Sequence, residues 1–180
     1  MNKVPFYTSV EVQLLPNGNV NCLYDHYTDL SLALAKYYTV CAAAVRSELT
    51  YHAAYLFDDQ GIYRDEAGTL YRRIFDRRED KTTHIYVTIE NQVRTDESKG
   101  LLYDSFNELK LGQQKYHYIC AAACVSEIPY HAGFLLDTDG VVINCAIWDR
   151  RVDEVPVEQE PEEEETPEEP VEPAVEGGEA

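Results

Sequence analysis

The chain contains no long hydrophobic run. Its longest apolar stretch is Ile119–Val125, far shorter than the roughly 20 residues that a membrane-spanning helix requires. The opening residues, MNKVPFYTSVE, also lack the apolar core of a secretion signal. We therefore expect no transmembrane segment, no signal peptide and no membrane partner.

The spacing of the cysteines fits no disulfide framework. The five cysteines are an odd number, and no CxxC pair occurs among them. Reduced thiols are typical of the cytoplasm, where we expect the protein to reside. Catalytic-triad motifs, phosphate-binding loops, HExxH and dinucleotide-binding fingerprints are also absent, so the sequence indicates no cofactor.

Basic residues are absent from the last part of the chain. From Val152 onward there are 13 acidic residues, no Lys or Arg, no aromatic residue and several prolines. The preceding 151 residues hold 20 acidic and 15 basic residues, so the formal net charge of −18 becomes −5 for this body. A segment of such composition cannot bury enough apolar surface to offset the entropy of ordering. We expect residues 152–180 to be a disordered acidic tail that either keeps the protein soluble or binds a partner.

What the sequence does contain is an internal repeat. Residues 41–61 are CAAAVRSELTYHAAYLFDDQG, and residues 120–140 are CAAACVSEIPYHAGFLLDTDG. A shift of 79 positions aligns residues 6–62 with 85–141 without a gap, and about 22 of the 57 pairs are identical. The first copy then carries about six extra residues, around 65–69, before IFDRR and IWDRR restore the match. This similarity predicts a tandem duplication.

Each copy has the pattern of a ββαββ unit. Its first segment alternates polar and apolar residues, which predicts a half-buried strand, and turn residues and a second short strand follow. Apolar residues at helical spacing come next. Asp25 and Asp104 can cap the two helices, and Ser105 with Glu108 matches a capping box. A strand, an Asp/Gly turn and a return strand close each unit.

These patterns predict an α+β fold made by tandem duplication of a ββαββ unit of about 70 residues. Copy one is expected to span residues 1–78 and copy two residues 85–151, with a linker at 79–84 and the acidic tail at 152–180. The copies should pack as one globular body of antiparallel sheet and helices with a pseudo-twofold axis. Such a body is either a monomer or resembles a dimer fused into one chain.

Two thiol–imidazole pairs recur at the same offset. Cys41 with His52, and Cys120 with His131, are the candidates for a nucleophile and its base. The alternative is that the small CAAA face of each helix packs closely on a sheet or on the other helix, because a free cysteine usually behaves as a small buried hydrophobe. We favour packing, since no family-type motif surrounds these residues.

A zinc site is a second hypothesis for the later cysteines. Cys120 and Cys124 are four residues apart on one predicted helix face, and His131 and Cys145 can complete a set of four ligands. The first copy has Val45 at the position of Cys124, and the chain lacks the paired spacing of zinc-binding motifs. We therefore assign no metal site.

Three polar positions of the first strand are identical in both copies. They are Tyr7 and Tyr86, Glu11 and Glu90, and Gln13 and Gln92. Because strand side chains alternate between faces, we expect all six to lie on the face away from the core. Identity at solvated positions indicates either a cross-strand polar pairing or a binding surface.

Each copy ends with an aromatic residue followed by Asp-Arg-Arg. The four arginines are Arg77, Arg78, Arg150 and Arg151. Together with Arg72 and Arg73 they can form a basic patch for a phosphate, an acidic partner or the chain's own tail. The simpler interpretation is an exposed strand end with local ion pairs.

Fourteen tyrosines are present, and tyrosine is enriched at interfaces. The sequence therefore favours a non-enzymatic cytoplasmic interaction module, whose duplicated surfaces bind a protein partner or a small ligand. One alternative is a small hydrolase or transferase that uses a Cys/His pair. Another is an acidic mimic of nucleic acid, which the modest charge of the body disfavours, and nucleic acid is not an expected partner.

Overall fold

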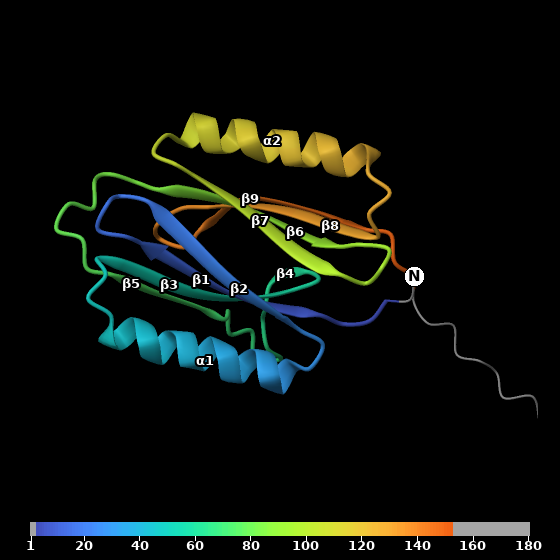
Figure 1. The fold of residues 1–180 in the computed structure, drawn as a ribbon, viewed down its shortest axis with the longest axis horizontal. Helices are drawn as coiled ribbons and strands as arrows, with labels where there is room; N and C mark the ends of the chain where they lie inside the picture. Colours follow the sequence, from blue (N-terminus) through green and yellow to red (C-terminus); the bar gives the residue numbers. More distant parts are fainter. Residues whose placement is uncertain (1–2, 153–180) are drawn as a thin grey trace, which may run out of the picture.

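The computed structural model describes residues 3–152, which form four layers (Figure 1). Two antiparallel sheets face each other in the middle, and one helix covers the outer face of each sheet (Figure 1). The predicted α+β class is thus confirmed. The acidic tail predicted from Val152 onward lies, apart from Val152 itself, outside the described residues.

The first sheet and its helix come from the first half of the chain. The elements are β1 (Tyr7–Leu14), β2 (Val20–Tyr27), α1 (Leu30–Arg46), β3 (Tyr51–Asp58), β4 (Gly61–Ile62) and β5 (Arg72–Asp76). The strand order is β2-β1-β3-β4, and β5 pairs with the other end of β3. Thus β3 and β1 are the central strands, β2 lies at one edge, and β4 and β5 share the other edge.

The second half repeats this arrangement. Its elements are β6 (Tyr86–Val93), β7 (Lys99–Phe106), α2 (Leu109–Val125), β8 (Tyr130–Leu136) and β9 (Val142–Asp149), with the strand order β7-β6-β8-β9. The register is also the same, because Gln13 pairs with His52 as Gln92 pairs with His131. Within residues 3–152, neither helix has the length and apolarity needed to cross a membrane.

Helix α1 begins later than the sequence predicted. Asp29, not Asp25, is its N-cap, and the Asp29 side chain accepts a hydrogen bond from Leu32 N at 3.0 Å. The reason is that β2 continues to pair with β1 as far as Tyr27, so Asp25 lies within a strand. There its carboxylate forms an ion pair with Lys36 of α1 at 2.8 Å.

Helix α2 differs from the prediction in the same way. Glu108 is its N-cap but makes no side-chain cap hydrogen bond, so the capping box predicted for Ser105 and Glu108 is wrong. Ser105 belongs to β7, which pairs with β6 as far as Phe106. Asp104 instead forms an ion pair with Lys115 of α2 at 2.7 Å.

Both faces of the central strands are covered. Between the sheets lies a mainly apolar core that includes Val10, Tyr55, Ile89 and Phe134. On the outer face of the first sheet, four buried residues of α1 pack against β3; they are Ala33, Tyr37, Val40 and Ala44. Within the CAAA segments, the last alanine of each, Ala44 and Ala123, is buried, whereas the two alanines before it are exposed. The helices lie on opposite outer faces of the molecule and do not pack on each other (Figure 1).

One polar cluster crosses the layer between the sheets. Asn91 Nδ2 donates to Thr8 Oγ1 at 3.2 Å, and Thr8 Oγ1 lies 2.9 Å from His26 Nδ1. Because Thr8 accepts from Asn91, its own hydroxyl proton is free to be donated to a neutral His26. Burial, together with the positive charge of Lys99, lowers the pKa of His26 to about 4, although Asp25 acts in the opposite direction.

The stability of the protein should depend on the charge of His26. An unfolded histidine has a pKa near 6.5, so between about pH 6.5 and 4 the unfolded chain binds a proton that the folded chain does not. Stability should fall as the pH is lowered through this window. His26→Ser, which installs the residue found at the corresponding position 105, should weaken this dependence. Thermal melts of both proteins at pH 7.5 and 5.0 test it, and parallel declines of the two melting temperatures would contradict it.

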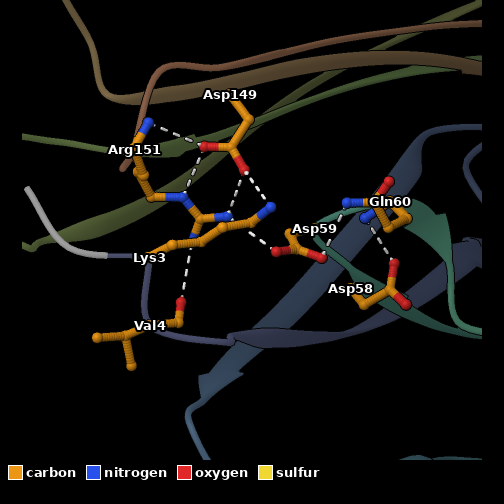
Figure 2. A network of polar contacts seen from close by, with 7 residues as sticks. All are labelled: Lys3, Val4, Asp58, Asp59, Gln60, Asp149 and Arg151. Atoms are coloured by element: carbon orange, nitrogen blue, oxygen red, sulfur yellow. Dashed lines mark hydrogen bonds and ion pairs between the residues drawn. The ribbon is translucent and has the colours of Figure 1, made fainter. Parts of the chain in front are cut away.

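The end of the second half is tied to the first half by Arg151. Its guanidinium lies between two carboxylates, with Nη2 at 2.8 Å from Asp149 Oδ2 and at 2.9 Å from Asp59 Oδ2 (Figure 2). Nη1 donates to Val4 O at 2.8 Å, and the side chain is only 1% exposed. Burial alone would raise the pKa of Asp149, but the hydrogen bonds and charge of Arg151 outweigh burial and lower it.

Arg78 makes the corresponding contacts at the end of the first half. Its Nε and Nη2 donate to the two oxygens of Asp76 at 2.9 and 2.8 Å, and Nη1 donates to Thr83 O at 2.6 Å. Thr83 is 79 positions after Val4. Each half therefore ends in an arginine that binds the segment leading into the first strand of the other half.

Removal of Arg151 should strongly destabilise the protein. Arg151→Ala leaves Asp149 and Asp59 facing each other without their shared cation, and breaking a buried ion pair in this way costs about 3–5 kcal/mol. Urea unfolding at pH 7 measures the loss. Arg94→Ala, at an exposed turn, is the control and should change the unfolding free energy by no more than about 0.5 kcal/mol. Equal effects of both variants would show that the Arg151 network contributes nothing.

Candidate binding site

The polar side chains of β1 are held beneath α1. His52 Nε2 donates to Glu11 Oε1 at 2.7 Å, and Gln13 Nε2 donates to the same oxygen at 2.5 Å. A carboxylate can only accept, so the Nε2 atom of His52 carries a proton. The side chain of His52 is 3% exposed and that of Glu11 is 14% exposed. Glu11 is paired with Ala54, whose side chain packs against α1.

The second half has the same cluster. His131 Nε2 donates to Glu90 Oε1 at 2.7 Å, and Gln92 Nε2 donates to this oxygen at 2.6 Å. The hydrogen bond from His131 is the main cause that lowers the pKa of Glu90, against the opposing effect of burial. In both halves the histidine Nδ1 atom is buried without a hydrogen-bond partner among the described residues.

The expectation that these positions face solvent is wrong. The outer face of each sheet carries a helix, so a strand residue that points away from the sheet–sheet core still becomes largely buried. Tyr7 and Tyr86 are half-buried on the same faces, and Tyr7 packs edge-on against Tyr63 with ring centroids 5.9 Å apart. The glutamate, histidine and glutamine contacts are those of a cross-strand polar pairing. A role of these six residues in binding stays a prediction.

Loss of the two glutamates should therefore reduce stability. Glu11→Ala combined with Glu90→Ala leaves each buried histidine N–H without its acceptor, which costs about 1–3 kcal/mol for each site. The matched control is Glu11→Gln with Glu90→Gln, which keeps an acceptor oxygen of the same reach and should cost less. Urea unfolding measures both. A double alanine variant as stable as the parent would show that these groups are effectively solvated.

Two of the four predicted arginines bind helix ends. Arg77 Nη2 donates to Ala44 O at 2.9 Å and to Val45 O at 3.1 Å, at the C-terminus of α1. Arg150 Nη2 donates to Ala123 O at 2.7 Å, near the C-terminus of α2. A cation at this end of a helix satisfies free carbonyl groups and interacts favourably with the helix dipole.

The six arginines considered in the sequence do not form one patch. Arg78 and Arg151 bind carboxylates and backbone carbonyl groups, as described above, and Arg72 donates to Gly140 O in the other half. Only Arg73 of β5 forms no hydrogen bond or ion pair with the described residues, and it is exposed. Among the six arginines, Arg73 is therefore the one whose guanidinium is available to bind a ligand.

The structure does not join Cys41 to His52 or Cys120 to His131 by a hydrogen bond. Each histidine bonds a glutamate instead. Burial raises the pKa of the Cys41 thiol, although a hydrogen bond with Tyr37 and the charge of Arg73 act in the opposite direction. An activated nucleophile needs the reverse shift.

The zinc candidates are also not brought together. Cys124 and Cys145 are exposed, whereas His131 is buried and bonded to Glu90. In residues 3–152, no group of three or more His, Cys, Asp or Glu side chains has an arrangement that could hold a metal ion.

Arg73 lines a groove between α1 and β5. The groove has a volume of about 290 Å³, and its lining residues are Tyr37, Tyr38, Cys41, Ala42, Val45, Arg73 and Phe75. Tyr38 is 58% exposed and Val45 is 60% exposed, so the helix side of the groove is accessible. An accessible groove with aromatic walls and one free guanidinium can bind an anionic group attached to an apolar one.

The extra residues of the first half extend this aromatic surface. Leu56 N donates to Tyr71 O at 2.9 Å, and Tyr63 N donates to Leu56 O at 2.7 Å, so the insertion is attached to β3. The ring of Tyr71 lies 5.6 Å from that of Tyr37 and 6.4 Å from that of Tyr38. Tyr63 continues the row, 5.2 Å from Tyr71.

The corresponding surface of the second half has different chemistry. Ala146 stands at the position of Arg73 and Trp148 at that of Phe75, and no insertion is present. In the sequence Arg73 is one of six arginines that lie near the ends of the two copies, so its position alone does not distinguish it from the others. The departure from the repeat at Arg73 was the signal that could have singled it out.

Comparison of the chain with protein-family models, with curated proteins and with solved structures finds no match.

Proposed function

We propose that the chain arose by tandem duplication and acts as a non-enzymatic binding module. The two halves share element order and strand register at a constant offset. They also share three side-chain contacts that the alternation of polar and apolar residues along a strand does not require. These are a buried Glu–His pair, an Asp–Lys ion pair between strand and helix, and an arginine bound to the C-terminus of the helix. Such repetition supports a common origin and a pseudo-twofold arrangement.

In this proposal residues 1–78 and 85–151 are the two copies, and residues 79–84 are an exposed linker between them. The copies function as one body, because the apolar core between the sheets takes residues from both. All five cysteines are free, which supports a cytoplasmic location.

The observation that carries the binding function is the free guanidinium of Arg73 in the groove between α1 and β5. The other arginines near the strand ends contact carboxylates or backbone carbonyl groups of the same chain. Arg73 has an aromatic neighbour on the same strand in Phe75 and an exposed one on the helix in Tyr38. These features support a ligand with a carboxylate or phosphate beside an aromatic or aliphatic group.

The ligand is either an acidic segment of a protein partner or a small organic acid, since both present the same chemistry to the groove. Binding is favoured over thiol-based catalysis because burial raises the pKa of Cys41. Recognition of nucleic acid is not favoured, because one free arginine does not make the extended basic surface that such binding needs.

A titration followed by NMR tests the proposal. Phenylacetate, added to the ¹⁵N-labelled chain, should shift the resonances of the groove residues, and the uncharged analogue phenylacetamide should shift them much less. Arg73→Gln should weaken phenylacetate binding about fivefold or more, which corresponds to about 1 kcal/mol. Arg94→Gln is the matched control for the loss of one exposed charge and should leave binding unchanged.

Two results would contradict the proposed site. One is equal binding of phenylacetate and phenylacetamide, which would remove the role of the charge. The other is unchanged binding to Arg73→Gln, which would place the anion elsewhere on the surface.

A further inference from the structure

The outer edge of β9 is open. β9 pairs with β8 along one side, and no described residue pairs with its other side. An open edge presents unpaired backbone N–H and C=O groups to any strand that can reach it. The question is therefore which strand this edge is suited to bind.

The hydrogen-bond pattern shows which backbone groups point outward. Arg150 N donates to Pro129 O at 2.7 Å, so the backbone groups of Arg150 face the β8 side. In an antiparallel pair, the groups of alternate residues point to the same side. Cys145, Ile147 and Asp149 therefore direct their N–H and C=O groups away from β8.

The corresponding edge of the first sheet, β5, carries charged side chains that disfavour pairing with another strand. β5 has the sequence RRIFD where β9 has CAIWD, so Arg72 and Arg73 are replaced by Cys145 and Ala146. Charged side chains on an edge strand oppose pairing with another chain. β9 has no such charge between Val142 and Trp148.

We propose that β9 pairs antiparallel with β9 of a second copy of this chain, centred on Ile147. In this register Trp148 lies opposite the small Ala146, Asp149 lies opposite Cys145, and no like charges face each other. The pairing would join the four-stranded sheets of two molecules into one sheet across a twofold axis. This dimer is independent of ligand binding at the Arg73 groove.

A second copy is a better occupant than the chain's own C-terminal segment. Residues 153–180 are rich in Pro and Glu, which are both poor strand formers. The β9 edge is self-complementary, because it offers the same alternation of donors and acceptors in both directions.

The experiment measures the mass of the full chain by sedimentation across the micromolar range, in reducing buffer at physiological salt. Trp148 is the only tryptophan and lies in β9, so its fluorescence on dilution gives a second reading of the same equilibrium. We expect a concentration-dependent rise to twice the monomer mass and a matching change in fluorescence.

Substitutions at Cys145 identify the edge. Cys145→Pro removes an outward N–H that makes no bond within the sheet, and Pro is tolerated at such edge positions. Cys145→Glu keeps the N–H but places a carboxylate opposite Asp149 of the second copy. Each should raise the dimer dissociation constant about tenfold or more. Cys145→Ser retains both the N–H and the small side chain and should dimerise like the parent. Thermal melts establish that each variant is folded.

The proposal is overturned if the full chain stays at the monomer mass throughout. A dimer that is equally stable in the Pro and Glu variants would place the interface elsewhere. A monomeric full chain whose truncated form, residues 1–152, dimerises would show that the C-terminal segment occupies the edge instead.

Discussion

The central strands of this protein are buried on both faces, and much of the structure follows from that constraint. The inner face meets the opposite sheet and the outer face meets a helix. A polar side chain on such a strand loses its contact with water and needs a partner within the protein. Glu11 and His52 meet this need in the first half, as Glu90 and His131 do in the second. Each helix therefore covers a polar group that is hydrogen-bonded within the sheet beneath it.

Alternation and repetition were sufficient to predict the elements, their order and the α+β class, because these depend on local patterns along the chain. The same patterns could not show whether one or both faces of a strand are buried, because this depends on whether a helix packs on the outer face of the sheet. For this reason the alternation predicts a solvated face for Glu11, although the structure covers that face with α1. The start of α1 was misplaced for a related reason: Asp25 is a good capping residue locally, but the pairing of β2 with β1 continues past it.

The arginines show why a repeated motif does not imply a repeated site. Arg77 and Arg78 follow each other in sequence, yet one binds the end of a helix and the other binds Asp76. Both follow the end of β5, and side chains of adjacent residues in an extended segment point to opposite sides, so the two arginines lie in different environments. Arg73, which lines the groove of the first half, corresponds to Ala146 in the second half. Divergence between the halves, more than their identity, marks the candidate binding site.

The backbone hydrogen bond from Lys3 N to Val152 O, 2.7 Å long, places the two ends of the described chain side by side. The connection between the halves, residues 79–84, is exposed. A circularly permuted chain, opened in this connection and closed by a short link between residues 3 and 152, would keep every strand pairing within each sheet. The same folded structure is then compatible with a chain in which the second half is synthesised before the first. Permutants of this kind would distinguish the contacts that determine the native structure from those that determine the folding pathway.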